Sequence, residues 1–158
     1  MGKRKYLAIL LVLCICVSAT CATKTCDTLS IEGNMAFPPY EFINENGEPD
    51  GLNVDLAKEI MKRMKVPYVI RLNKWSEVLT SFKKGEVDLI LGMNISSERM
   101  KIYKFGPIHG YVYQVAIFRK GTPPIHTLSQ FKNKRIIVLY KTISEELLRK
   151  AGYTENQF

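Results

Sequence analysis

The chain has 158 residues, of which 46% are hydrophobic and 24% are charged. This is ordinary globular composition, long enough for one domain with a hydrophobic core, and it excludes a low-complexity or disordered protein. The formal charge of +8 falls to +5, with 20 basic against 15 acidic side chains, once Lys3, Arg4 and Lys5 are set aside as part of an N-terminal leader. The remaining basic residues are scattered along helix faces, so we expect no nucleic-acid partner.

The N-terminus has the three-part order of a secretory signal. A basic head (Met1–Lys5) precedes a compact apolar run (Tyr6–Val17) and a stretch of small residues (Ser18–Ala22). The apolar run is shorter than the roughly 20 residues that a membrane-spanning helix needs. We therefore expect residues 1–21 to be a signal peptide and the mature part to be periplasmic or otherwise extracytoplasmic, with an uncleaved anchor as the alternative.

All four cysteines lie near this leader. Cys14 and Cys16 fall within the apolar run and would leave with it. Cys21 resembles the position where bacterial lipoproteins are cut and acylated, so lipid anchoring at Cys21 is the alternative to simple cleavage nearby. A free Cys21 could instead close a small disulfide loop with Cys26. Neither residue has the spacing or His neighbour of a zinc site, so we expect no metal and no cofactor.

Apolar periodicity predicts regular elements along the first part of the mature chain. In order, we expect a strand over Leu29–Glu32, a stiff loop over Asn34–Tyr40, a hairpin that begins at Glu41–Ile43, a helix over Asn53–Lys65, a strand over Tyr68–Leu72, a helix from Trp75 to Lys83 and a buried strand over Val87–Leu91. In the first helix, the apolar face is expected to consist of Leu56, Ala57, Ile60, Met61 and Met64. This alternation of strands and helices predicts an α/β fold with a parallel or mixed sheet, whose ligands collect at the carboxyl ends of the strands.

The junction Gly92–Arg99 follows the third predicted strand and carries the strongest functional signal. Arg99 has a planar guanidinium that can donate two parallel hydrogen bonds to a carboxylate. A helix that begins near Ser96 would add unpaired backbone amides. A structural ion pair is the alternative reading of Arg99.

Further elements are expected downstream. They are a strand over Tyr111–Phe118, a crossing segment over Lys120–Pro124, a short helical turn at Leu128–Phe131, a strand over Arg135–Leu139 and a helix from Ile143 that ends at Gly152. Thr142 and Glu145 have the spacing of a capping box at the start of the last helix. This second unit is too small to bury a core of its own.

Four ordered segments resemble the bacterial extracellular solute-binding proteins of family 3. They are Ala36–Phe42, Gly51–Lys58, Gly85–Met93 and Ser97–Met100. The resemblance implies a periplasmic-binding-protein-like fold in which two α/β lobes close on a small solute. The first lobe would cover 27–119 and be largely present, 120–124 would be the hinge, and 125–158 would begin a truncated second lobe.

The resemblance also implies a ligand site. In it, Phe37 and Trp75 would be aromatic walls, Asn34, Gly92, Asn94 and Ser96 would supply polar contacts, and Arg99 and Thr142 would hold a ligand carboxylate. Each residue has a structural alternative. Trp75 is spaced as a core residue, Thr142 and Ser96 suit helix caps, Asn34 suits a turn, and Phe37 could plug a loop. His109 is expected to be a structural loop residue rather than a ligand.

Some positions depart from the family pattern. Asn34 stands where amino-acid binders commonly have Asp, Lys141 and Ile143 flank Thr142 where small residues are usual, and the late carboxylate of the second lobe has no counterpart. A standard amino-acid ligand is therefore not assured. The segment Gly106–Gly110 looks closer to versions fused to sensor kinases than to importer receptors.

Together these features predict a module that binds a small carboxylate-bearing, amino-acid-like solute for ABC import or ligand sensing. The alternative is the outer sensor region of a membrane histidine kinase, and the less favoured one is a fragment of a dehydratase or murein-cleaving enzyme. Partners would be the solute and either an ABC permease or the chain's own membrane signalling domains. No enzymatic activity is expected, because no nucleophile, acid–base or metal constellation is present and Glu145 and Glu146, being consecutive in a helix, point apart.

Overall fold

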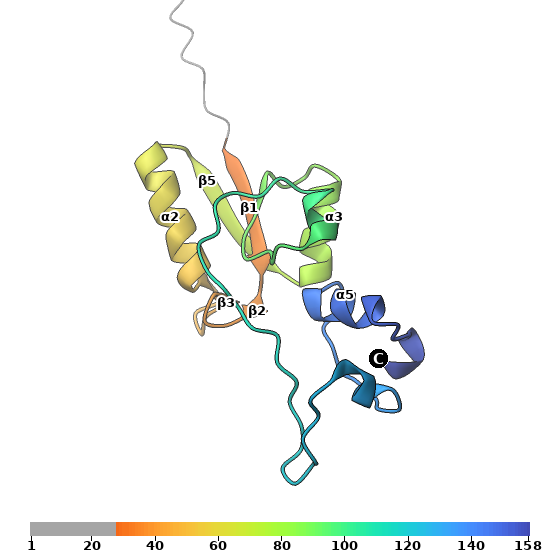
Figure 1. Cartoon of the computed structure of the whole chain (residues 1–158). Coiled ribbons are helices and arrows are strands. Elements are labelled where there is room, and N and C mark those ends of the chain that lie inside the picture. The colour runs from red at the N-terminus through yellow and green to blue at the C-terminus, as the bar shows by residue number, and fades with distance from the viewer. Residues whose placement is uncertain (1–27) are drawn as a thin grey trace, which may run out of the picture.

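The computed structural model describes residues 28–158, so the predicted signal peptide and Cys21 lie outside the described part. Its elements are β1 (Leu29–Asn34), β2 (Ala36–Phe37), β3 (Glu41–Ile43), β4 (Pro49–Asp50), α2 (Leu52–Met64), β5 (Tyr68–Asn73), α3 (Trp75–Lys83), β6 (Leu89–Ile90), α4 (Ser97–Met100), the 3-10 helix η1 (Leu128–Phe131), α5 (Ile143–Lys150) and the 3-10 helix η2 (Glu155–Gln157). Figure 1 shows a part built around a sheet, from which an extended stretch of chain leads to a smaller segment that carries α5.

A parallel sheet forms the centre of the first part. Its strand order is β5-β1-β6, and β1 pairs with β5 along its whole length, from Leu29 opposite Tyr68 to Asn34 opposite Asn73. β6 is shorter than the predicted strand, although the backbone N–H of Leu91 still donates to the β1 carbonyl of Glu32 at 2.8 Å. The predicted parallel α/β sheet is confirmed, and all three strands end at the same edge.

Helix α2 covers one face of this sheet (Figure 1). Its buried side chains Val54, Ala57 and Met61 pack with Ile31 of β1 and with apolar residues of β5 and the β6 end. The predicted face is wrong at three of its five positions, because Leu56, Ile60 and Met64 are exposed. The buried face consists of Asn53, Val54, Ala57 and Met61, so Asn53 and Val54 belong to it in place of Leu56, Ile60 and Met64.

Helix α3 lies on the other side of the sheet (Figure 1). Trp75, Val78 and Leu79 are buried there as a second apolar cluster, against which Ile90 and Tyr103 pack. The helix ends in basic residues followed by a glycine, as its stop signals predict. The two clusters sandwich the sheet, which is the layering expected of a helix-covered α/β unit.

A small antiparallel sheet, β2-β3-β4, adjoins the end of β1 and confirms the predicted hairpin. Gly51 follows β4 with φ of +113°, and a Cβ there would lie 2.6 Å from the carbonyl oxygen of Tyr40. Only glycine fits this position, which turns the chain from the hairpin into α2.

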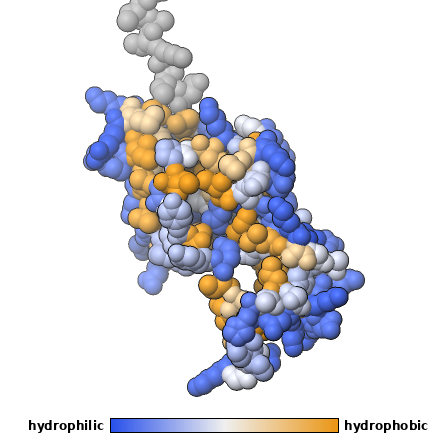
Figure 2. All heavy atoms as spheres, viewed as in Figure 1, coloured by the Kyte–Doolittle hydropathy of each residue, from blue (hydrophilic) through white to orange (hydrophobic). Residues whose placement is uncertain are grey.

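Two predicted strands are not formed. Residues 111–118 and 135–139 have no strand structure, and alternate side chains of the first stretch are largely exposed, with Tyr111 at 82% and Ile117 at 90%. Figure 2 shows hydrophobic residues gathered on the visible face of the sheet-bearing part, where this chain passes. A strand needs a neighbour for its backbone hydrogen bonds. Within residues 28–158 neither stretch pairs with a strand, although the N–H of Ile136 donates to the carbonyl of Gln157 at 2.7 Å, so apolar sequence alone does not produce strands here.

The C-terminal segment, residues 125–158, contains the predicted turn at Leu128–Phe131 and the predicted helix α5. The predicted capping box is wrong. The Glu145 carboxylate accepts from the backbone N–H of Lys141 at 2.5 Å instead of that of Thr142, and the Thr142 hydroxyl donates to the carbonyl of Leu139 at 2.6 Å. Glu145 therefore holds the loop in front of the helix rather than the first helical turn.

Candidate functional site

Arg99 is buried in the short helix α4 at the strand-end edge of the sheet. Ser96 caps this helix, which was its structural alternative, because its hydroxyl accepts from the backbone N–H of Arg99 at 3.2 Å. The guanidinium donates through Nη1 to the carbonyl of Asn94 at 3.1 Å and through Nη2 to the carbonyl of Lys141 at 3.2 Å. The Arg99 side chain therefore connects its own loop to the segment that carries α5.

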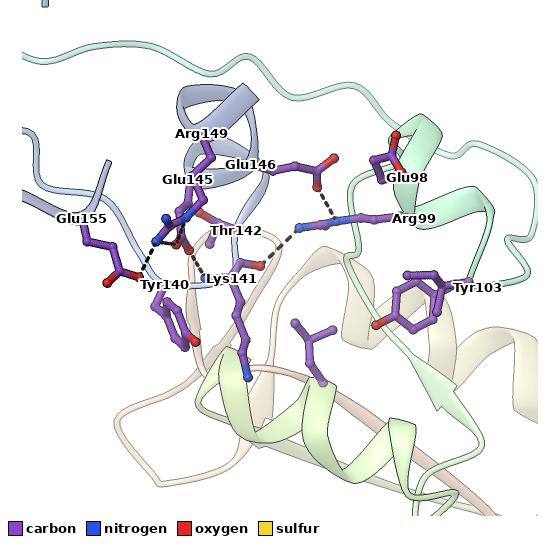
Figure 3. A pocket seen from close by; sticks show the side chains of 12 residues that line it. Glu98, Arg99, Tyr103, Tyr140, Lys141, Thr142, Glu145, Glu146, Arg149 and Glu155 are labelled. Carbon is purple, nitrogen blue, oxygen red and sulfur yellow. Dashed lines mark hydrogen bonds and ion pairs between the residues drawn. The ribbon is translucent and has the colours of Figure 1, made fainter. Parts of the chain in front are cut away.

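A carboxylate of the chain itself lies on this guanidinium. Glu146 Oε2 is 3.3 Å from Arg99 Nε (Figure 3). Glu146 Oε1 accepts from the hydroxyl of Ser96 at 2.6 Å. Both predicted readings of Arg99, an ion pair and a carboxylate-binding group, thus concern the same atoms. This arrangement can hold a carboxylate between a guanidinium and a hydroxyl.

Trp75 also contacts the C-terminal segment. Its indole Nε1 donates to the carbonyl of Lys141 at 2.8 Å, the same carbonyl that Arg99 reaches. Lys141 has a left-handed φ of 60°. The rest of the Trp75 side chain is buried with Val78 and Leu79, so the core alternative for this residue accounts for its packing.

An open pocket of about 480 Å³ lies where α3 and α4 meet the C-terminal segment (Figure 3). Its lining residues are Leu79, Glu98, Arg99, Ile102, Tyr103, Tyr140, Lys141, Thr142, Glu145, Glu146, Arg149 and Glu155. Of the predicted site residues, Arg99 and Thr142 are in this lining. The predicted residues outside it are Asn34, Phe37, Trp75, Gly92, Asn94 and Ser96.

Asn34 and Phe37 lie at the end of β1 and in β2. The Asn34 side chain accepts from the backbone N–H of Ala36 at 3.1 Å, which is the turn-forming contact that was its structural alternative. The half-buried ring of Phe37 lies 5.1 Å from that of Tyr40, measured between centroids. Neither residue is brought against Arg99 by these contacts.

A buried glutamate between these segments was missed by the sequence reasoning. Glu41 is 1% exposed, and its carboxylate accepts from the backbone N–H of Asn34 at 3.0 Å and from the side-chain amide of Asn53 at 3.2 Å. Asn53 Oδ1 in turn lies 3.2 Å from His109 Nε2. His109 is thus a loop residue tied to the first helix, as expected. The signal for Glu41 was its place in the strand, where alternation directs the charged side chain inward.

Glu41 also explains why position 92 is glycine. Gly92 has a φ of +64°, and a Cβ there would lie 2.5 Å from Glu41 Oε1. The carboxylate therefore fixes the end of β1 and the start of the loop that leads to Arg99. Glu41 therefore supports the loop that carries Arg99, but it does not line the pocket.

Replacing Glu41 by glutamine should change how stability depends on pH. Burial raises the pKa of the Glu41 carboxyl above its ordinary value of 4.5, against the opposing effects of the hydrogen bonds from Asn34 and Asn53 and of the charge on His109. Because folding favours the protonated form, the stability contributed by this group is fully present below pH 4.5 and is lost as the pH rises through the folded pKa.

The glutamine can keep both contacts if the Asn53 amide turns over, so we expect a folded variant. The free energy of unfolding, measured with urea from pH 4 to 7, should fall with rising pH for the wild type relative to Glu41→Gln. Parallel pH profiles for the two proteins would contradict the burial effect.

Residues 28–158 contain no group of three or more His, Cys, Asp or Glu side chains that could hold a metal ion. Over the same range, every helix is too short or too polar to span a bilayer. Glu145 and Glu146 bind different partners, Lys141 and Arg149 for the first and Arg99 and Ser96 for the second.

Comparison with known proteins gives several amino-acid-binding relatives. The L-cystine-binding protein TcyJ of Escherichia coli (strain K12) is 29% identical over 124 residues, which are 77% of this chain and 47% of that protein. The probable ABC transporter arginine-binding protein ArtJ of Chlamydia trachomatis serovar D is 27% identical over 138 residues, 83% of this chain and 54% of that protein. The chain spans about half the length of these curated relatives.

A shorter match links the chain to part of an enzyme. The membrane-bound lytic murein transglycosylase F of Vibrio cholerae serotype O1 is 34% identical over 91 residues, 56% of this chain but 17% of that protein. Among solved structures, a histidine kinase sensor domain with similarity to periplasmic binding proteins superimposes with a TM-score of 0.77 at 33% identity, covering 82% of this chain and 57% of that one.

The family model for bacterial extracellular solute-binding proteins, family 3, matches residues 29–153. This match covers the sheet, Arg99 and α5, so it includes every predicted ligand-binding residue, from Asn34 to Thr142. The chain belongs to this family and has its periplasmic-binding-protein-like α/β fold.

Proposed function

We propose that this chain is an extracytoplasmic solute-binding module that takes a small carboxylate-bearing, amino-acid-like solute. The observation that carries the proposal is the buried Arg99 guanidinium, which lies at the strand-end edge and lines a pocket shared with the C-terminal segment. Arg99 would hold the solute carboxylate, with Ser96 and Thr142 as polar neighbours. Family membership and the cystine- and arginine-binding relatives support this solute class.

The mechanism would be closure of two lobes around the solute. Residues 27–119 would form the first lobe, 120–124 the hinge and 125–158 part of the second. Contacts from both lobes favour the closed state because the solute binds it better than the open one. Import and sensing use the same step, and the signal at 1–21, with a lipid on Cys21 as the alternative anchor, would place the module outside the cytoplasmic membrane.

Binding is the proposed activity, rather than catalysis. The pocket residues have mutual ion pairs and hydrogen bonds but no nucleophile next to a base. The match to the murein transglycosylase covers a small share of that protein. The sensor-domain likeness favours sensing as the second candidate role, and ABC import is supported by the name of the arginine-binding relative.

A thermal-shift screen of this chain against the common amino acids, L-cystine and simple carboxylates tests the proposal. A solute present at a hundred times its Kd should stabilise the chain by about 2.7 kcal/mol and raise the Tm by several degrees. Carboxamide and decarboxylated analogues of an active solute should give no shift, because they lack the anion for Arg99. The proposal fails if every compound leaves the Tm unchanged.

A further inference from the structure

The anion position on Arg99 is filled by the protein itself. Glu146 places one carboxylate oxygen on Arg99 Nε and the other on the hydroxyl of Ser96. We propose that Glu146 is a specificity-determining residue of this site, and that a solute carboxylate binds Arg99 and Ser96 only by displacing the Glu146 carboxylate. This inference rests on the proposed function and names what the solute must compete with.

The contact is more enclosed than the surface ion pairs of the chain. The side chains of Arg99 and Glu146 are 11% and 28% exposed, whereas those of the pair Arg63–Glu59 are 79% and 49% exposed. Ser96 has a single hydroxyl proton, and it goes to Glu146. A solute carboxylate cannot receive that hydrogen bond, or take the ion-pair position beside Arg99 Nε, while Glu146 stays in place.

The other charged groups around the pocket are occupied elsewhere (Figure 3). Glu145 accepts from Arg149, which also pairs with Glu155 at 3.2 Å. Glu98 pairs with Lys101 at 2.9 Å. The ammonium of Lys141 lies over the ring of Tyr140, 5.2 Å from its centroid. Glu146 is thus the acidic group of the pocket lining that faces Arg99, and the guanidinium is its cationic partner.

This arrangement selects among carboxylates. Glu146 is tethered beside Arg99, so its effective concentration there is high, in the millimolar range or above. If a plain carboxylate such as acetate displaced Glu146, one carboxylate would replace another on the same donors. No further contact would form, so binding would gain no free energy. Only a solute with further groups for the pocket, such as the rest of an amino acid, can displace Glu146 at low concentration.

The chain contains its own reporter for the exchange. Trp75 is the single tryptophan, and its indole donates to the Lys141 carbonyl that also accepts from Arg99. Glu146 lies in α5, which begins two residues after Lys141, and Glu146 and the Lys141 carbonyl both contact the Arg99 guanidinium. Trp75 fluorescence should therefore change when a carboxylate takes the position.

The test uses the full chain, Glu146→Gln, Glu146→Ala and a matched control, Glu59→Gln. The control removes the same charge and an ion pair, on the exposed face of α2. Each protein is titrated with L-arginine, with argininamide, and with sodium acetate against sodium chloride at equal ionic strength, following Trp75 fluorescence and calorimetric heat. Circular dichroism and Tm establish that each variant is folded.

We expect both Glu146 variants to bind L-arginine about tenfold more tightly than the wild type, the gain of one competing charged contact. They should also respond to acetate at concentrations where the wild type and Glu59→Gln do not, and argininamide should show no gain. Equal L-arginine affinities in folded wild type and variants, or weaker binding in the variants, would overturn the inference and leave the proposed function standing. Absence of every carboxylate response in all four proteins would overturn both.

Discussion

Arg99→Met should weaken solute binding by about a hundredfold or more. The guanidinium is the cation that the pocket offers to an anion at the strand-end edge, and it is buried, so water does not replace the contacts it loses. Removing one partner of a desolvated, hydrogen-bonded charge pair typically weakens binding by about 2–5 kcal/mol, which is roughly thirtyfold to several thousandfold. Isothermal titration calorimetry with the solute identified by the thermal-shift screen measures the change in Kd.

Two further variants separate the charge from its geometry. Arg99→Lys keeps the positive charge but loses the planar fork, so we expect it to retain part of the affinity, with a loss of about tenfold. Arg63→Met removes an exposed arginine that pairs with Glu59 at 2.7 Å, and it should bind like the wild type. An Arg99→Met protein that is folded and binds with unchanged Kd would contradict the role given to the guanidinium.

Arg99 also stabilises the contact with the C-terminal segment. Its loss removes the donors to the carbonyls of Asn94 and Lys141 and the partner of Glu146. We expect a decrease of about 1–3 kcal/mol in the free energy of unfolding, since these acceptors are half-buried. The binding measurements should therefore be made at a temperature well below the Tm of the variant.

The sheet and its two helices could be predicted from the sequence because their signals are local. The strands at Leu29–Asn34 and Tyr68–Asn73 and the helix at Trp75–Lys83 come from periodicity, capping and turn residues that lie within a few positions of one another. Periodicity was less informative about orientation. It could not tell that Asn53 rather than Met64 belongs to the buried face of α2, because Asn53 is buried through its bond to Glu41.

The two absent strands show what a local pattern cannot supply. Residues 111–118 are rich in the β-branched and aromatic residues typical of strands, but a strand exists only with a partner, and the partner of a strand is a property of the whole sheet. The described residues contain no neighbour to pair with it.

The sequence could indicate where in the fold the candidate site lies, but it could not indicate which side chains contact one another there. Ends of parallel strands meet at one edge, which put the segment of Arg99 near that of Trp75, and both now reach the carbonyl of Lys141. Ser96 and Glu146, however, are separated by 50 positions, and no periodicity joins them. The same holds for Glu41, whose partners come from the end of β1 and from α2. Buried polar networks assemble only when the elements pack.

Gly92→Ala should destabilise the fold by about 3 kcal/mol or more. The substitution meets two penalties at once. A φ of +64° is unfavourable for alanine, at about 1 kcal/mol, and the new Cβ would lie 2.5 Å from a carboxylate oxygen of Glu41. A side-chain oxygen can usually move aside, but this one is buried and bonded to Asn34 and Asn53, so overpacking adds about 2 kcal/mol or more.

Gly85→Ala is the matched control, because Gly85 also has a positive φ, +75°, and no atom within 4 Å of the position its Cβ would take. Its free energy of unfolding should fall by about 1 kcal/mol, the cost of placing alanine at a positive φ alone. Urea unfolding followed by the fluorescence of Trp75 gives the free energies, and the same two substitutions are then made in a Glu41→Ala background. Without the Glu41 carboxylate, the destabilisation caused by Gly92→Ala should decrease to that caused by Gly85→Ala. If the two glycines are equally sensitive while Glu41 is present, the close approach of Glu41 to the loop before Arg99 is not what requires glycine there.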